Sequence, residues 1–283
     1  MTRPMTGYLV RYGEYDDRII EKISGLFSQS FPKSTKFTKE YLNWQYFENP
    51  NGAVVSFNAW TEADEIVAHY AAIPIKMKME GRIEDGLLSL NTATHPDHQG
   101  KGLFVRLATE TYKYAREHGY KYVIGVANNN STHGFLNRLG FDLISPLHVK
   151  VGWGNAYAKN VSQSLIRVYY DEEIIMWRLR CPEFTYTIKD GTIYGNLGIP
   201  FFRTSVAKVP ENISQGAITL DKAPCGLSLY IGIGADLSGY YVNLPKFIKR
   251  SPFNLIFKDL TDGELPKLTS ENIFFQLLDY DVA

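Results

Sequence analysis

The chain has 283 residues, of which 45% are hydrophobic and 21% are charged, and its 30 basic residues balance its 30 acidic ones. This composition is that of an ordinary globular protein and excludes a disordered chain, a collagen or a disulfide scaffold. A net charge of zero provides no field to hold a nucleic acid or an anionic membrane, so neither is expected as a partner. Only two cysteines and a start without an apolar leader predict a cytoplasmic protein with reduced thiols.

Hydrophobic periodicity divides the first half of the chain into alternating strands and helices. The predicted elements are, in chain order, a strand at 8–12, helices at 19–27 and 38–44, strands at 53–60, 66–79 and 86–95, a helix at 103–117, a strand at 122–127, a helix at 132–139 and a strand at 141–151. The three strands between 53 and 95 are expected to form an antiparallel meander.

The second half resembles a worn copy of the first. Tyr41–Trp44 precedes Pro50 and a strand, and Ile174–Trp177 precedes Pro182 and a strand. The later expected elements are a turn at 153–155, a hairpin at Asp190-Gly191, a strand at 227–231, a helix at 237–249 and a strand at 254–257. Their strand, helix, strand order repeats that of residues 87–127.

These patterns predict an α+β fold of two tandem modules of similar design. The modules are expected at 1–150 and 151–283, each with a mixed, mostly antiparallel sheet flanked by helices, and with the second module degenerate. Gly232-Ile233-Gly234 precedes the helix predicted at 237–249, but no Gln/Arg-x-x-Gly-x-Gly/Ala pattern does, so only the first module is expected to bind a ligand at this junction.

The segment Leu90–Phe104 joins a predicted strand directly to a predicted helix through glycines. The free N–H groups and the positive end of a helix favour anions there, and glycine lets the backbone approach them closely. Lys101 would add a positive charge. The spacing is neither that of a Walker loop nor that of Gly-x-Gly-x-x-Gly, and such a segment alone is also typical of a turn before a capped helix.

This segment resembles the Gln/Arg-x-x-Gly-x-Gly/Ala pattern of the GNAT superfamily of acyl-CoA-dependent N-acyltransferases. Gln99, Gly102 and the preceding Pro96 match, whereas Phe104 stands where Gly or Ala is usual. Residues 123–130 are similar to the superfamily's next strand and its Asn, and residues 134–141 to the following helix and its Gly-Phe ending. The similarity is good over 86–143.

The resemblance implies acyl-CoA as co-substrate and no metal. The strands ending near His95 and Asn128 would part and take the pantetheine arm between them, a form of β-augmentation. A backbone N–H near Ala93 or Thr94 would stabilise the oxyanion. The implied CoA-binding residues are Thr92, Ala93, Thr94, Gln99, Gly100, Lys101, Gly102, Leu103, Phe104, Asn128, Asn130 and Phe135.

Proton transfer asks for a group that changes charge near neutral pH, and three histidines lie in or beside the motif. The predicted catalytic residues are His133, His95 and Asn91, with His98 as a weaker candidate. Leu136 occupies the position of a Tyr that serves many superfamily members as acid, so Tyr70 or Ser131 could substitute. A base relayed through water by Asn91, Thr92 or His69 stays open.

The layout also resembles a tandem branch of the superfamily associated with polysaccharide gene clusters. It implies transfer from acetyl-CoA or a short hydroxyacyl-CoA to a dTDP-linked amino-dideoxyhexose, at one site between the halves of a monomer. The implied acceptor-binding residues are Trp44, Tyr46 and Arg178. Two alternatives remain: acylation of a free small amine or protein N-terminus, which an acidic groove would favour, and a non-catalytic acyl-CoA sensor.

Overall fold

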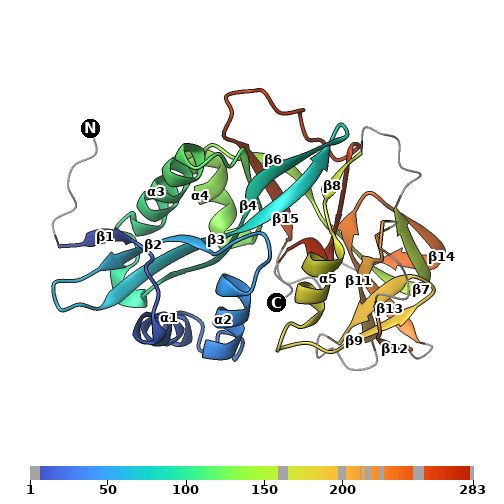
Figure 1. The fold of residues 1–283 in the computed structure, drawn as a ribbon, viewed down its shortest axis with the longest axis horizontal. Coiled ribbons are helices and arrows are strands. Elements are labelled where there is room, and N and C mark those ends of the chain that lie inside the picture. Colours follow the sequence, from blue (N-terminus) through green and yellow to red (C-terminus); the bar gives the residue numbers. More distant parts are fainter. Residues whose placement is uncertain are drawn as a thin grey trace.

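The computed structural model describes residues 7–158, 165–196, 202–210, 212–213, 218–222, 226–244 and 252–280. In the first half, helices cover both faces of a sheet (Figure 1). Helices α1 (Asp17–Ser30) and α2 (Lys39–Phe47) lie on one face, and α3 (Leu103–Glu117) and α4 (Asn129–Leu139) lie on the other. Layers of this kind confirm the predicted α+β class.

Local capping fixes where the first two helices begin. Asp16 Oδ1 accepts the Ile19 N–H at 2.8 Å, and Thr38 Oγ1 accepts the Tyr41 N–H at 3.1 Å. Both side chains satisfy amides that the helix itself leaves free. The helix predicted at 38–44 is therefore confirmed, with Thr38 as its N-cap, and α1 starts earlier than its apolar pattern alone indicates.

The first sheet has the strand order β1-β2-β3-β4-β5-β15-β6. Its strands are β1 (Leu9–Tyr12), β2 (Val55–Trp60), β3 (Ile66–Met79), β4 (Arg82–Thr94), β5 (Tyr122–Ala127), β15 (Asn254–Asp259) and β6 (Asp142–Pro146). Strands β1 to β4 pair antiparallel, and β5 runs parallel to β4. The predicted meander and the strand–helix–strand crossover through α3 are thus confirmed.

The second half repeats this order around its own sheet. After α5 (Glu172–Leu179), the paired strands run β9 (Tyr186–Lys189), β10 (Thr192–Gly195), β11 (Phe202–Lys208), β13 (Leu227–Ile233), β7 (His148–Ala158) and β14 (Ala235–Asn243). Strand β11 is parallel to β13 as β4 is to β5. The short β12 (Asp221–Lys222) extends the sheet beyond β9.

The two halves exchange one strand each, so that each sheet contains a strand from the other half. Strand β15 comes from the second half and lies between β5 and β6, while β7 begins before residue 151 and lies between β13 and β14. Strands β8 (Ile166–Val168) and β16 (Ile273–Gln276) join the two sheets. The arrangement agrees with two modules of similar design, whereas the boundary between 150 and 151 stays a prediction and falls inside β7.

The helix predicted at 237–249 is wrong over its described part. Residues 235–243 form β14, which pairs with β7 along its whole length, including Gly239 opposite Gly154. A Cβ on Gly239 would lie 2.2 Å from the Trp153 carbonyl oxygen, so glycine permits the strands to approach here. The turn predicted at 153–155 is likewise part of β7, and residues 245–249 lie outside the described residues.

The repeated tryptophans meet where the two halves touch. The rings of Trp44 on α2 and Trp177 on α5 stack with centroids 5.0 Å apart. Trp44 Nε1 donates to the Trp177 carbonyl and Trp177 Nε1 donates to the Trp44 carbonyl, each at 3.0 Å. This reciprocal contact shows that the two positions matched by sequence are also equivalent in space.

Candidate acyl-CoA site

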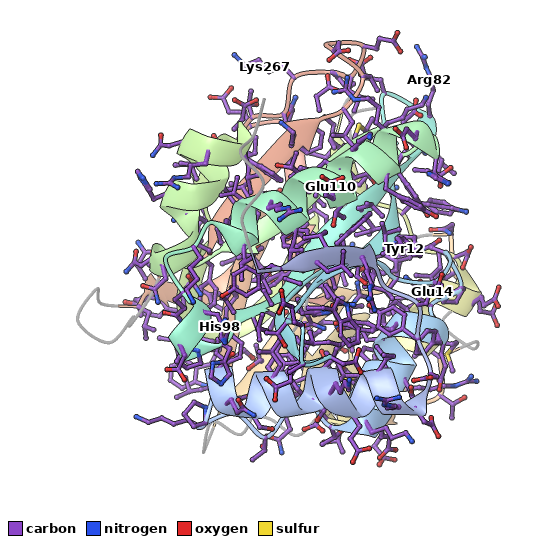
Figure 2. All side chains as sticks on the ribbon, turned by 90° about the vertical axis from the view of Figure 1, so that its left-hand side faces the viewer. Tyr12, Glu14, Arg82, His98, Glu110 and Lys267 are labelled. Atoms are coloured by element: carbon purple, nitrogen blue, oxygen red, sulfur yellow. The ribbon has the colours of Figure 1, made fainter. Side chains whose placement is uncertain are left out.

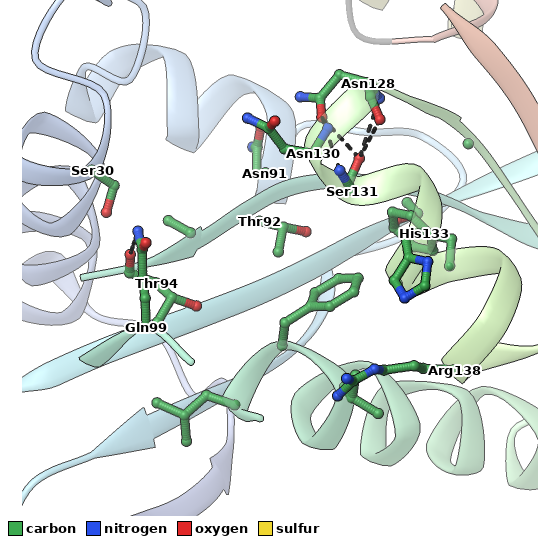
Figure 3. A pocket seen from close by; sticks show the side chains of 18 of the residues that line it. Ser30, Asn91, Thr92, Thr94, Gln99, Asn128, Asn130, Ser131, His133 and Arg138 are labelled. Carbon is green, nitrogen blue, oxygen red and sulfur yellow. Dashed lines mark hydrogen bonds between the residues drawn. The ribbon is translucent and has the colours of Figure 1, made fainter. Parts of the chain in front are cut away.

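A cavity of 660 Å³ opens where β4 and β5 part (Figure 3). The two strands pair at Leu87–Val123, Leu88–Ile124 and Ser89–Gly125. Beyond these pairs β4 continues to Thr94 and β5 to Ala127. The predicted parting is present, and it leaves an edge of β4 open to an extended amide chain.

A β-bulge shapes β4 at this point. Leu90 pairs with Ala71 and Ala93 with His69, so Asn91 and Thr92 together stand opposite the single residue Tyr70. Asn91 adopts a left-handed backbone with φ 44° and lines the cavity. Bulges of this kind redirect side chains beside active sites.

Glycines form a cradle at the start of α3. Gly100 and Gly102 have φ of 72° and 73°, which a residue with a Cβ rarely adopts. Gly102 is the N-cap residue of α3, and no side chain caps this end. The amides of the first turn are therefore left for an anion, as the motif predicts.

The side chains of the same loop hold it in place. Gln99 Nε2 donates to the Thr94 carbonyl at 3.2 Å, and Lys101 Nζ donates to Tyr8 Oη at 2.9 Å and to the Asp97 carbonyl at 3.2 Å. Tyr8 Oη also lies 2.6 Å from Nδ1 of His98, which Figure 2 shows on the side of the molecule that carries β1. Desolvation, followed by the charge of Lys101, lowers the pKa of His98.

Phe104, the departure from the family pattern, is accommodated by Gly134 on α4. A Cβ at Gly134 would lie 2.7 Å from the Phe104 ring. The ring also packs edge-to-face on Phe135, with centroids 5.1 Å apart. The larger residue on α3 is thus matched by a missing side chain on α4.

Helix α4 begins at the cavity through its cap. Asn128 Oδ1 accepts the N–H groups of Asn130 at 3.0 Å and Ser131 at 3.1 Å, and Ser131 Oγ accepts the Asn128 N–H at 3.2 Å. This capping box starts the helix at residue 129 rather than at the predicted 132.

The histidine candidates differ in where they lie relative to the cavity. His133 lines the cavity from α4, and its Nδ1 lies 2.7 Å from the Asn137 amide nitrogen, which donates to it. His95 caps a short 3₁₀ turn, Pro96–His98, by accepting the Asp97 N–H at 3.2 Å. The cavity lining includes His98 but not His95.

The three predicted acceptor-binding residues lie away from the cavity. Trp44 and Tyr46 are buried in the core, and Arg178 is 5% exposed with its guanidinium carbon 4.7 Å from the Trp177 ring centroid. None of the three contributes to the lining. Trp44 instead stacks on Trp177 where the two halves meet, and Tyr46 bonds to His69 within the first half.

Every residue that the resemblance assigns to CoA lines the cavity, as do Asn91 and His133. Sequence reasoning missed Ser30 and Phe31 at the end of α1, Arg138 on α4 and Ile256 on β15. Arg138 follows Gly134 by one helical turn, so helical spacing could have found it. Ile256 lines the cavity from the second half of the chain, and no local sequence pattern predicts this position.

A chain of buried side chains stands behind the bulge. His69 is fully buried, and burial lowers the pKa of its ring to about 3, well below the usual 6.5. Its Nδ1 lies 2.6 Å from Asn58 Oδ1, and its Nε2 lies 2.8 Å from Tyr46 Oη. The ring is therefore neutral and bonded at both nitrogens.

This burial makes stability depend on pH. Below about pH 6.5 the unfolded chain binds a proton at His69 that the folded chain refuses, so the unfolding free energy falls by up to about 1.4 kcal/mol per pH unit toward pH 3. His69→Gln is expected to flatten this slope in urea unfolding at pH 4.5, 5.5 and 7.0. His118→Gln, at an exposed histidine, is the control. Equal slopes in the native chain and His69→Gln would contradict the assignment.

Comparison with known proteins agrees with this geometry. Residues 11–144 match the acetyltransferase (GNAT) domain family. An Enterococcus faecalis protein described as a probable N-acyltransferase aligns over 89% of this chain and 73% of its own, with TM-score 0.56 and 8% identity. A GCN5-related N-acetyltransferase from Anabaena variabilis aligns over 90% and 74%, with TM-score 0.59 and 11% identity. No curated protein matches the sequence.

The family match, over residues 11–144, and the geometry of the site support an acyl-CoA-dependent acyltransferase. The matched residues line most of the cavity, and Ile256 on β15 lines it from outside the matched range. Across the described ranges, His, Cys, Asp and Glu do not gather into a group that could hold a metal ion. In the same part of the chain, no helix has the length and apolar character to cross a membrane.

Proposed function

We propose that the chain transfers an acyl group from acyl-CoA to the primary amine of a nucleotide-linked amino sugar, a dTDP-amino-dideoxyhexose. The observation that carries this proposal is the charge of the cavity. The described residues that line it include no Asp or Glu, and they include Arg138, a cation that the resemblance does not assign to CoA. A polyamine or a basic peptide would find no carboxylate there, whereas a sugar with an anionic carrier meets no repulsion.

Neutral hydrogen-bonding groups support a hydroxyl-rich acceptor. Ser30, Asn91 and Asn130 line the cavity. Ser30 Oγ is buried and has no hydrogen-bond partner among the described residues. A buried hydroxyl without a partner is costly, and a sugar hydroxyl would satisfy it. Figure 3 places Ser30 on the far side of the pocket from Arg138.

The residues present fit acyl-CoA. The amides that begin α3 and the glycines at 100 and 102 would hold the pyrophosphate, and the unpaired edge of β4 from Thr92 to Thr94 would bind the pantetheine arm and the oxyanion. Acyl-CoA supplies the thioester that the amine attacks. Positioning of the two reactants can supply on the order of 7–11 kcal/mol of the activation barrier.

His133 is proposed to act at the leaving group. Its Nδ1 accepts from Asn137, which leaves the Nε2–H of the neutral ring free to donate. That N–H would donate a hydrogen bond to the leaving thiolate at the place of the superfamily Tyr, which is Leu136 here, and the thiolate would take its proton from solvent. The amine's own proton would leave through solvent at the exposed mouth of the cavity.

Thiol release from acetyl-CoA tests the proposal. We expect dTDP-4-amino-4,6-dideoxyglucose to stimulate release at least about 10-fold over the rate without acceptor, and spermidine or a peptide N-terminus to stimulate it far less. Preference for spermidine or the peptide would overturn the sugar assignment. Tight CoA binding with no turnover of any amine would instead support the non-catalytic sensor.

A further inference from the structure

Asn91 combines three unusual properties. It sits in the bulge of β4, it is 9% exposed while lining the cavity, and its φ of 44° lies in the left-handed region. Asn adopts this backbone more readily than most residues other than glycine, and non-glycine residues with this backbone cluster at functional sites. The hydrogen bonds behind Asn91 show what holds it.

The direction of these bonds follows from the innermost pair. Asn58 Oδ1 can only accept, so the proton of His69 lies on Nδ1, 2.6 Å away. The ring is neutral, which leaves Nε2 as a bare acceptor. Tyr46 Oη, 2.8 Å from Nε2, must therefore donate its proton to His69.

The same logic then fixes the Asn91 amide. Tyr46 has given its proton to His69, so its oxygen accepts from Asn91 Nδ2 at 3.1 Å. Asn91 Nδ2 also donates to Gln45 Oε1, and Gln45 Nε2 donates to Tyr41 Oη at 3.0 Å. Both amide hydrogens of Asn91 are thus committed to the interior. Its Oδ1 receives no donor from the described residues and is left to the cavity.

We propose that Asn91 Oδ1 accepts a hydrogen bond from the acceptor amine and thereby aims the nitrogen lone pair at the thioester carbon. This role rests on the proposed acyl transfer. In that step the nitrogen bonds to the acyl carbon, the carbon–sulfur bond breaks, and the amine proton passes to solvent while the thiolate is protonated. Asn91 takes no proton, and Tyr46 and His69 are positioning residues that hold its amide in one orientation.

Asn91→Gly tests the contact without disturbing the bulge, because glycine adopts a φ of 44° freely. The assay measures acetyl-CoA turnover with dTDP-4-amino-4,6-dideoxyglucose and, separately, with ethylamine. We expect kcat/KM for the amine to fall about 10- to 100-fold, with the KM for acetyl-CoA unchanged. Unchanged kcat/KM for an amine that is turned over would overturn the role of Asn91 and leave the transferase standing.

Tyr46→Phe tests whether the hydrogen bonds behind Asn91 position its amide. It keeps the buried ring but frees the Asn91 amide to turn, so we expect a loss of about 3- to 10-fold in the native background and no further loss beside Asn91→Gly. Tyr122→Phe is the matched control, because Tyr122 is equally buried and its hydroxyl donates to the backbone carbonyls of Ile75 and Glu84, which do not belong to the hydrogen-bond network of Asn91. Independent losses from Tyr46→Phe and Asn91→Gly would overturn the positioning role.

The two acceptors separate this inference from the proposed function. Turnover of ethylamine but not of the sugar would overturn the proposal that the acceptor is an amino sugar. The role of Asn91 would then still be tested by kcat/KM for ethylamine. Turnover of neither amine would overturn both proposals.

Discussion

A valine in place of Gly102 is expected to raise the dissociation constant for acetyl-CoA at least about 100-fold, measured by isothermal titration calorimetry. Gly102 has φ 73° and is the N-cap residue of α3, so a β-branched side chain forces the backbone out of this conformation. The first-turn amides of α3 would then no longer converge on one anion. A loss of this size corresponds to a few charge-assisted hydrogen bonds to phosphate.

Gly119→Val is the matched control for this experiment. Gly119 follows the other end of α3 with φ 83°, and a Cβ there meets no atom within 4 Å. It imposes a similar backbone cost far from the cavity, so we expect a lower Tm but unchanged binding. Native affinity for acetyl-CoA in Gly102→Val would show that the amides at the start of α3 do not bind its phosphates. An equal loss of affinity in both variants would show that the effect comes from reduced stability.

The glycine loop and the cavity beside it could be predicted from sequence because their determinants are local. A glycine at Gly102 and an Asn at Asn128 each specify a backbone conformation or a cap within a few residues. Strand and helix periods on either side then place the loop at the end of β4. The orientation of the Asn91 side chain could not be predicted in this way, since it depends on Tyr46 and His69 from other elements.

The exchange of strands could not be predicted in this way. Strand β15 lies beside β6 in the sheet although more than a third of the chain separates them in sequence, and no local pattern names a distant partner. The same limit explains the acceptor-side predictions. An aromatic residue such as Trp44 looks alike in sequence whether it stacks on a ligand or on Trp177, and the structure shows the second.

Trp44→Ala is expected to lower the free energy of unfolding by about 3–5 kcal/mol, measured by urea denaturation. Trp44 is 5% exposed, so the truncation leaves a large cavity between the halves. It also leaves the Trp177 carbonyl without its donor in a buried place. A loss below about 1 kcal/mol would contradict this packing role.

Conservative variants separate the hydrogen bond from the ring volume. Trp44→Phe keeps an aromatic ring but removes the bond to Trp177, whereas Trp60→Phe removes an indole nitrogen that is buried without a partner among the described residues. We expect Trp44→Phe to cost about 1 kcal/mol more than Trp60→Phe.

The exchange of β7 and β15 decides how this loss appears in the unfolding curve. Neither sheet is complete without a strand from the other half, so neither half keeps its core when the other unfolds. Trp44→Ala is therefore expected to shift one cooperative transition to lower urea with an unchanged slope. A second transition in Trp44→Ala would show instead that the halves unfold separately, and that the tryptophan pair alone couples them.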